Sequence, residues 1–123
     1  MPSDSRVARG VAAFNAGRFF EAHEIWEDLW LETVGPEKVL LQGLVQIAAG
    51  YAKVESGIRG GAAKLLARGV ELVRTFGVTS LGLALEPFVE GIDADLQRLH
   101  GAAPAEVSLA LMRVPNLRGD GDL

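Results

Sequence analysis

Residues 36–56, PEKVLLQGLVQIAAGYAKVES, are the most apolar helical stretch of the chain, with apolar side chains that recur at helical spacing. Because Pro36 suits the first turn of a helix, the pattern predicts a helix from Pro36 to about Ser56. Residues 57–61, GIRGG, predict a short turn. A further helical pattern follows in residues 62–76, AAKLLARGVELVRTF, so these two helices should form an antiparallel hairpin.

Three further helical patterns surround this hairpin. The first should begin at a capping residue, Ser3 or Asp4, and end near Gly17, and the second should run from Arg18 to about Thr33. Residues 77–85, GVTSLGLAL, are ambiguous between a loop and a helical turn, and a last helix is expected from residue 86 or 87 to about residue 100. Alternating β-branched residues are almost missing, so we predict an all-α fold, a compact bundle of about five helices.

The length of 123 residues favours one domain. We expect residues 1–102 to form the helical domain and residues 103–123 to be a partly ordered C-terminal tail. Its last six residues, RGDGDL, have little to bury and should fray. Gly43 and Gly50 share a stripe of the third helix, which predicts a neighbouring helix or an aromatic ring close to the backbone there.

Composition excludes several classes of function. A net charge of −4 and a pI near 5.1 argue against a nucleic acid partner, which needs a concentrated basic face. The absence of cysteine excludes disulfides and thiolate metal sites. The longest uncharged run, residues 39–52, falls short of the roughly 18 residues that a membrane span needs. We therefore expect a soluble, cytoplasmic protein that has no membrane partner.

Residues 19–30, FFEAHEIWEDLW, contain the most distinctive pattern of the chain. A helix turns by about 100° per residue, which sorts this segment into two faces. One face carries the acidic residues Glu21, Glu24, Asp28 and Glu32. The other face carries Phe19, His23, Trp26 and Trp30, with Phe20 and Glu27 at its edge. The sorting predicts that His23 faces the core and that Glu27 lies one turn beyond it.

His23 and Glu27 are a candidate pair of metal ligands. At i, i+4 spacing, an imidazole nitrogen and a carboxylate oxygen could ligate one divalent ion, such as Zn, Ni, Mn or Fe. HEIWE does not match the zinc protease motif H-E-x-x-H, because Glu27 stands where the second histidine belongs. The alternative is a hydrogen-bonded pair in which each polar group satisfies the other near the core.

A second polar pair interrupts the apolar third helix. Gln42 and Gln46 also stand at i, i+4 spacing, and Lys53 continues the same face. If this stripe meets His23 and Glu27, the result is a polar cluster walled by the aromatic residues Phe19, Trp26 and Trp30, with Tyr51 as a further candidate. Such a cluster could be a ligand pocket or a structural network that fixes the register of the helices. By contrast, Glu86, Glu90, Asp93 and Asp95 are spaced like a solvated helix face.

Residues 14–30, FNAGRFFEAHEIWEDLW, and residues 40–66, LLQGLVQIAAGYAKVESGIRGGAAKLL, resemble DUF309, a prokaryotic family of unknown function. The family motif, H-x-x-x-E-x-x-(W/Y), is met by His23, Glu27 and Trp30. The resemblance implies an all-helical fold and a motif that has been suggested to bind a metal, but no reaction. Many members have a histidine where this chain has Lys53 and an asparagine where it has Ile58. A protonated lysine cannot replace a histidine as a metal ligand. If that histidine is a ligand in the family, this chain has lost the metal or uses Lys53 for an anionic ligand.

The sequence is compatible with two functional hypotheses. In the first, His23 and Glu27 hold a divalent metal ion, Gln42 or Gln46 or water completes the site, and hydrolysis is a reaction to test. In the second, the protein is a non-enzymatic helical module whose polar residues form a structural network or a small-ligand pocket and whose function lies in association with itself or a partner. We expect a symmetric homodimer in either case, because an apolar chain of this size leaves a stripe to cover and two-fold dimers are the commonest assemblies.

Overall fold

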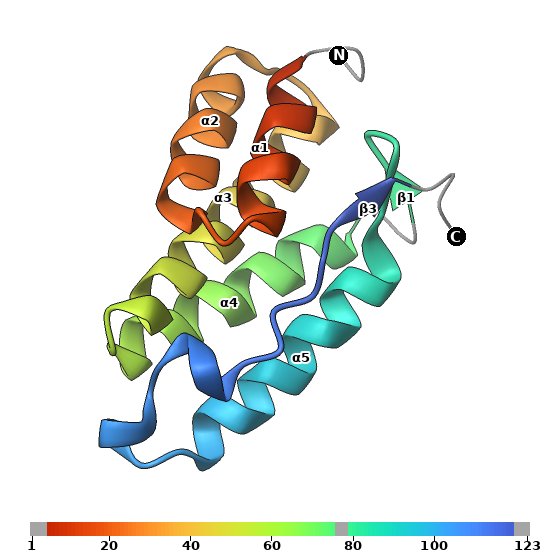
Figure 1. Cartoon of the computed structure of the whole chain (residues 1–123). Coiled ribbons are helices and arrows are strands. Elements are labelled where there is room, and N and C mark those ends of the chain that lie inside the picture. Colours follow the sequence, from red (N-terminus) through yellow and green to blue (C-terminus); the bar gives the residue numbers. More distant parts are fainter. Residues whose placement is uncertain (1–4, 76–78, 120–123) are drawn as a thin grey trace.

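The computed structural model describes residues 5–75 and 79–119. Within these residues the chain forms five helices, α1 (Ser5–Asn15), α2 (Phe19–Glu32), α3 (Pro36–Glu55), α4 (Arg59–Arg74) and α5 (Leu85–Gly101). They pack closely, so the predicted all-α bundle is confirmed (Figure 1). The predicted start of the first helix, at Ser3 or Asp4, lies outside the described residues. None of the described helices combines the length and the apolar character that a membrane crossing requires.

The helical hairpin of α3 and α4 lies at the centre of the bundle. It packs against α2 on one side and α5 on the other, and α1 packs against α2 (Figure 1). A Cβ atom added to Gly43 would lie 2.9 Å from the carbonyl oxygen of Gly69, and one added to Gly50 would lie 2.8 Å from the side chain of Leu66. The predicted close approach at these two glycines is therefore confirmed, and the approaching element is α4.

The turn between α3 and α4 is shorter than predicted. Gly57 has a φ of 76°, and the amide of Ile58 donates to the carbonyl of Lys53, which ends α3 in a Schellman motif. Because that motif completes the reversal by Ile58, α4 begins at Arg59 and includes Gly60 and Gly61. Gly60 and Gly61, which the sequence indicated as turn residues, are thus helical, whereas Gly57 lies in the turn.

The segment before α5, which the sequence left ambiguous between a loop and a helical turn, contributes two strands to a small antiparallel sheet. This sheet consists of three two-residue strands, β1 (Thr79–Ser80), β2 (Leu83–Ala84) and β3 (Arg118–Gly119), in the order β1-β2-β3. Arg118 and Gly119 pair with β2 instead of fraying, and residues 120–123 lie outside the described residues. The sheet therefore joins the start of α5 to the C-terminal end of the described chain.

The segment after α5 packs onto the helices. It contains two 3₁₀ turns, η1 (Pro104–Glu106) and η2 (Leu109–Leu111), and buries Val107, Met112 and Leu117. The side chain of Asn15 on α1 donates to the carbonyl of Leu117 at 2.9 Å and accepts from its amide at 2.8 Å. These contacts connect the C-terminal segment to the first helix.

Aromatic rings form the middle of the core. The ring of Phe14 on α1 lies 5.2 Å from Phe19, 6.0 Å from Trp26, 5.8 Å from Tyr51 and 5.4 Å from Phe88, measured between centroids. All five residues are buried. The contacts with Phe19, Tyr51 and Phe88 are edge-to-face, and such contacts add to the stabilisation from buried area. One cluster thus ties α1, α2, α3 and α5 together.

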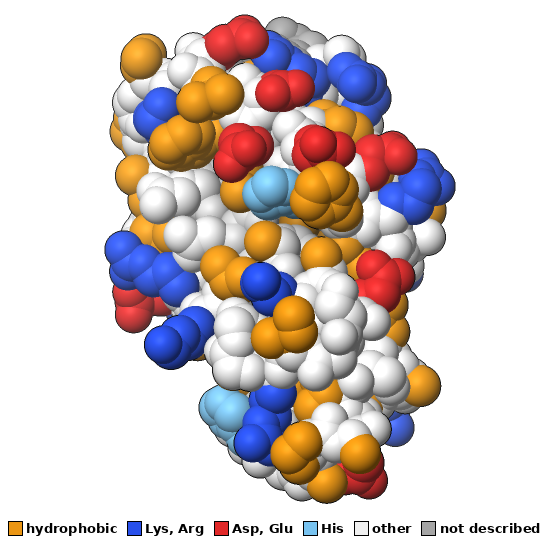
Figure 2. Space-filling view, turned by 90° about the vertical axis from the view of Figure 1, so that its left-hand side faces the viewer, with side chains coloured by type: hydrophobic (Ala, Val, Ile, Leu, Met, Phe, Trp, Pro, Cys, Tyr) orange, Lys and Arg blue, Asp and Glu red, His pale blue; other side chains and the backbone are white. Residues whose placement is uncertain are grey.

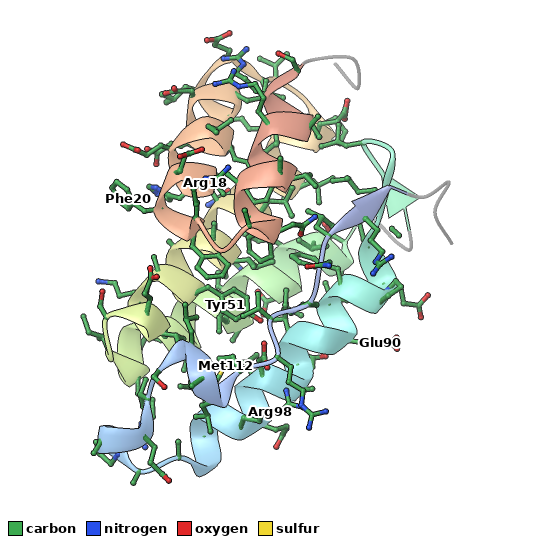
Figure 3. The ribbon with its side chains drawn as sticks, in the orientation of Figure 1. Arg18, Phe20, Tyr51, Glu90, Arg98 and Met112 are labelled. Carbon is green, nitrogen blue, oxygen red and sulfur yellow. The ribbon has the colours of Figure 1, made fainter. Side chains whose placement is uncertain are left out.

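A buried carboxylate lies beside this cluster. Asp95 on α5 has no exposed surface, and its Oδ2 atom accepts a hydrogen bond from the Tyr51 hydroxyl at 2.6 Å. Its Oδ1 atom accepts from Arg98 at 2.7 Å and from the amide of Arg113 at 2.8 Å. Figure 3 shows Tyr51 reaching from α3 towards α5. Burial, and next the hydrogen bond to Asp95, raises the pKa of Tyr51 far above its ordinary value. The prediction that Asp95 lies on a solvated face is wrong.

Candidate functional site

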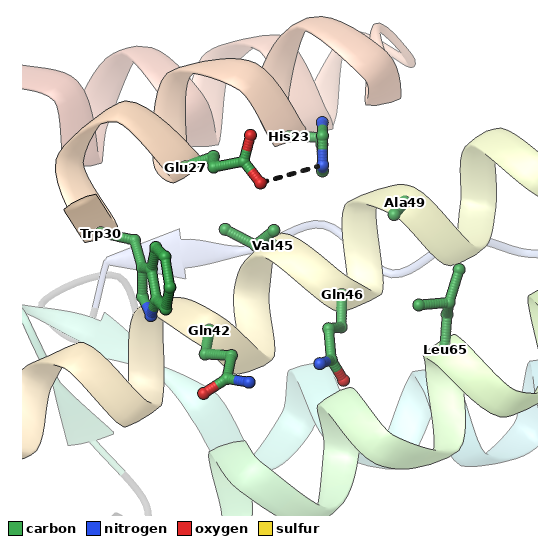
Figure 4. A pocket seen from close by; sticks show the side chains of 8 residues that line it. All are labelled: His23, Glu27, Trp30, Gln42, Val45, Gln46, Ala49 and Leu65. Carbon is green, nitrogen blue, oxygen red and sulfur yellow. Dashed lines mark ion pairs between the residues drawn. The ribbon is translucent and has the colours of Figure 1, made fainter.

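A pocket of about 260 Å³ lies where α2, α3 and α4 meet. It is lined by His23, Glu27, Trp30, Gln42, Val45, Gln46, Ala49 and Leu65 (Figure 4). The polar pairs on α2 and α3 therefore face the same space, as the helical spacing of the sequence suggested.

Helical spacing places these side chains. His23 and Glu27 stand one turn apart on α2, and the imidazole Nε2 atom lies 3.8 Å from the Glu27 Oε2 atom. Their side chains are 22% and 49% exposed, so both are reachable from solvent. The prediction that His23 faces the core is wrong. The buried residues of α2 are Phe19, Ala22, Trp26 and Leu29, and His23 lies on the flank of that stripe.

Neighbouring side chains hold the walls of the pocket. The ring of Phe20 stacks on that of His23, with centroids 5.7 Å apart and planes inclined by 28°. The Lys38 ammonium lies 4.1 Å from the centre of the Trp30 ring and donates to the Trp30 carbonyl at 3.0 Å. The cation–π contact holds the indole beside Lys38 of α3, and the hydrogen bond joins the same lysine to the backbone of Trp30.

Three buried polar atoms in the described residues lack a hydrogen-bond partner in the protein. They are His23 Nδ1, Trp30 Nε1 and Gln46 Oε1. All three belong to side chains that line the pocket. The other indole nitrogen, Trp26 Nε1, donates to the Val7 carbonyl at 3.4 Å. Buried polar atoms nearly always have a hydrogen-bond partner. The three atoms without one therefore indicate that this pocket is a place where a bound molecule could supply hydrogen bonds.

A second pocket of about 210 Å³ adjoins the first, and the two share His23 and Ala49. Its lining residues are Phe20, His23, Ala49, Ala52, Lys53, Ser56 and Ile58. We refer to the two pockets together as the α2–α3 groove. Figure 2 shows this face, on which acidic side chains are more frequent in the upper half and basic and apolar side chains lie in both halves.

The candidate residues from the sequence separate into two groups. Trp30, Gln42 and Gln46 line the first pocket with His23 and Glu27, and Lys53 lines the second. Phe19 and Trp26 lie in the core with Tyr51 and are part of neither pocket lining.

Residues 7–65 match the family model of a domain of unknown function, DUF309. The chain carries a DUF309 domain. Both pocket linings fall within the matched segment, whose last residue, Leu65, lines the first pocket. None of the curated proteins compared with the chain matches it.

The DUF309 domain offers a metal ion few ligands. Among the described residues, no group of three or more His, Cys, Asp or Glu side chains could hold an ion. His23 and Glu27 provide two donors, and the other polar side chains of the first pocket are the amides of Gln42 and Gln46. Amide oxygens are weak ligands for Zn or Ni, so this donor set does not by itself form a closed site for these metals.

Part of the groove in the DUF309 domain was not predicted from the sequence. Val45, Ala49, Ala52 and Ser56 line it from α3, between and beyond the two glutamines. These residues continue the i, i+3, i+4 stripe that begins at Gln42, so the spacing already contained the signal. The contribution of Leu65 depends on the position of α4 and had no such signal.

Proposed function

We propose that the DUF309 domain binds a small polar molecule in the first pocket of the α2–α3 groove. The observation that carries the proposal is the set of three buried polar atoms without a protein partner, all on side chains that line this pocket. Burying such an atom without a hydrogen bond costs roughly 1–3 kcal/mol, so a fold that keeps three at one place gives up stability there. A ligand that pairs with them recovers that cost.

The lining defines the ligand in general terms. Trp30 offers an N–H donor, Gln46 an acceptor oxygen and Glu27 a carboxylate, while Val45, Ala49 and Leu65 offer apolar contact. The volume of about 260 Å³ is slightly below the range of roughly 300–1,000 Å³ typical of small-molecule sites, so the part of the ligand that this pocket holds should be compact. The proposal assigns binding and no reaction. Association as a two-fold dimer stays a prediction from the sequence.

The two tryptophans provide a direct test. The chain contains Trp26 and Trp30 only, so a ¹⁵N-labelled sample gives two indole N–H signals. We expect small polar fragments, such as amides, amines and carboxylates, to shift the Trp30 signal and leave the Trp26 signal in place, because Trp26 is bonded to Val7 in the core. Trp30→Phe assigns the signals. If every fragment that binds shifts both signals equally or neither, the proposal is wrong.

A substitution at Gln46 separates binding from structure. Gln46→Leu removes a buried acceptor that has no partner, so we expect the free energy of unfolding to rise by about 1 kcal/mol and fragment affinity to fall about fivefold. Gln42→Leu is the matched control, since Gln42 lines the same pocket and its amide is not among the buried unpartnered atoms. Urea denaturation and the Trp30 titration measure the two effects. A loss of stability in Gln46→Leu would instead assign Gln46 to a structural network.

We propose metal binding at His23 and Glu27 as a second candidate function, because their Nε2 and Oε2 atoms lie 3.8 Å apart at the edge of the same pocket. A modest side-chain rotation brings such atoms to one ion, and water or a partner molecule would have to supply the remaining ligands. Hydrolysis belongs to this candidate alone and is worth assaying only after an ion is found.

Metal content by mass spectrometry decides this candidate. This candidate predicts that untagged protein purified without chelator carries close to one equivalent of Zn, Ni, Mn or Fe, and that His23→Ala and Glu27→Gln lose it. Glu24→Gln is the control, since Glu24 is exposed on the same helix and is not part of the pocket lining. Wild-type protein without stoichiometric metal, also after dialysis against each ion, would exclude the candidate.

A further inference from the structure

The two pockets of the α2–α3 groove are lined by side chains of opposite charge. The first pocket has Glu27 at its edge, and the second has Lys53. We propose that the groove holds one small bipolar molecule, with a cationic group beside Glu27, an anionic group beside Lys53 and an apolar chain or ring between them. This inference rests on the proposed function and deepens it by naming the class of ligand.

The groove is continuous along one face of α3. Gln42, Val45, Gln46 and Ala49 line the first pocket, and Ala49, Ala52, Lys53 and Ser56 line the second. Successive members are three or four residues apart or adjacent in sequence, so they form a single stripe of the helix. One molecule can therefore contact both pockets without leaving the surface of α3.

The Lys53 end attracts an anion. A Cβ atom added to Gly61 would lie 3.3 Å from the Lys53 Cδ atom, so the lysine side chain runs along the first turn of α4. The first-turn amides of a helix have no intrahelical partner and form its positive end. The N-cap residue of α4, Ile58, supplies no side-chain cap.

Among the described residues, the lysine charge at this place has no counter-charge. Within residues 5–75 and 79–119, no ion pair of Lys53 is found, and its ammonium adds to the positive end of α4 instead of offsetting it. A carboxylate or phosphate group beside Lys53 would meet both the ammonium and the helix end.

The Glu27 end attracts a cation. The ion-pair partner of Glu27 within the described residues is His23, at 3.8 Å. The charged residues beside it in the sequence of α2, Glu24 and Asp28, are also acidic and do not neutralise it. A primary amine or guanidinium group beside Glu27 would form a charge-assisted hydrogen bond there.

The middle of the groove is apolar. The stacked rings of Phe20 and His23 form one wall, and Phe20 is 63% exposed. Ala49 and Ala52 form the floor, and Ile58 lines the other side of the second pocket. An apolar chain or ring would remove this surface from water, which is favourable, whereas a fully polar ligand would not.

The helix also sets the length of the ligand. Figure 4 shows Glu27 above Val45, and the rise of 1.5 Å per residue places Val45 and Lys53 about 12 Å apart along α3. Both charged side chains are flexible, so charges separated by about 10 Å suit the groove. An extended ω-aminooctanoate has close to this separation, whereas ω-aminobutanoate is too short.

The test uses ω-aminooctanoate as the probe, with octylamine, octanoate and ω-aminobutanoate as comparisons. Binding is followed by NMR at the Trp30 indole for the first pocket and at the Ala52 amide for the second. We expect ω-aminooctanoate to shift both signals and to bind about fivefold more tightly than either monopolar compound, since each exposed ion pair contributes up to about that factor. The advantage should shrink at high salt.

Charge-removing variants assign the two ends. Lys53→Met should lower the affinity for ω-aminooctanoate to that of octylamine, and Glu27→Gln should lower it to that of octanoate. Lys64→Met and Glu24→Gln, which remove exposed charges outside both pocket linings, should leave it unchanged. Equal losses from the control variants would mean non-specific attraction and would overturn the inference.

The outcomes also distinguish this inference from the proposed function. If octylamine shifts the Trp30 signal and the added carboxylate gains nothing, the first pocket binds ligands and the bipolar class is wrong. If octanoate shifts Ala52 alone and Glu27→Gln has no effect on ω-aminooctanoate, one molecule does not span the groove. If no compound of the series binds at its solubility limit, the inference fails, and the fragment experiment alone decides the proposed function.

Discussion

Asp95→Ala should lower the free energy of unfolding by about 3–4 kcal/mol, one of the two largest losses that we expect from a single substitution in this protein. The substitution removes the carboxylate that accepts from the Tyr51 hydroxyl, the Arg98 side chain and the Arg113 amide. Tyr51 is fully buried, so its hydroxyl would lose its partner in a place that water does not reach. The measurement is the urea midpoint of unfolding, at unchanged dependence on denaturant.

The neighbouring acid provides the control. Asp93 lies two residues away on α5, is 42% exposed at its side chain, and pairs with Arg74 at the surface. Asp93→Ala should therefore cost less than about 1 kcal/mol. Asp95→Asn keeps the shape and part of the hydrogen bonding and should fall between the two. If Asp95→Ala costs no more than Asp93→Ala, the buried network does not stabilise the fold as the geometry indicates.

Asp95 also shows which part of the structure the sequence could have predicted. Ile92 and Leu99 are buried on α5, and Asp95 stands three residues after the first and four before the second. Helical spacing thus placed Asp95 on the apolar stripe, but its charge suggested a solvated residue. Of its three partners, Arg98 is local, but Tyr51 and Arg113 are distant in sequence, and no local pattern indicates that the chain returns to α5 at Arg113. A buried charge is hard to predict when its partners are distant in sequence.

The candidate site, too, could be predicted from the sequence only in part. Spacing within each helix predicted His23 with Glu27 and Gln42 with Gln46, and both pairs line one pocket. Spacing alone did not separate Trp26 from Trp30. Trp26 turns to α1, where a Cβ atom on Gly10 would lie 2.1 Å from its Nε1 atom, so a glycine on another helix makes room for the indole. The side of α2 that is core depends on where α1 packs, and the spacing within α2 does not indicate this.

Gly69→Ala should lower the free energy of unfolding by about 3 kcal/mol through a clash at the crossing of α3 and α4. A Cβ atom on Gly69 would lie 2.5 Å from Ile47 Cγ1, 2.8 Å from the Gly43 carbonyl oxygen and 3.1 Å from the Ile47 amide nitrogen. Two of these three atoms belong to the backbone, so a change of side-chain rotamer cannot relieve the contact. The two helices would have to move apart and lose packing along the central hairpin. Urea denaturation measures the loss.

Gly60→Ala is the matched control on the same helix, because nothing lies within 4 Å of its added Cβ atom. Alanine is the better helix former, so the free energy of unfolding of this variant should rise by up to about 1 kcal/mol, opposite in sign to Gly69→Ala.

Gly43→Ala introduces a methyl group at the same crossing from α3, and a Cβ atom there would lie 2.9 Å from the Gly69 carbonyl oxygen. Once the methyl group of one variant has moved the two helices apart, the methyl group of the other requires a smaller further movement. The double variant should therefore cost less than the sum of the single variants. Strictly additive losses would mean that the two glycines act at independent places, against the contact between their backbones.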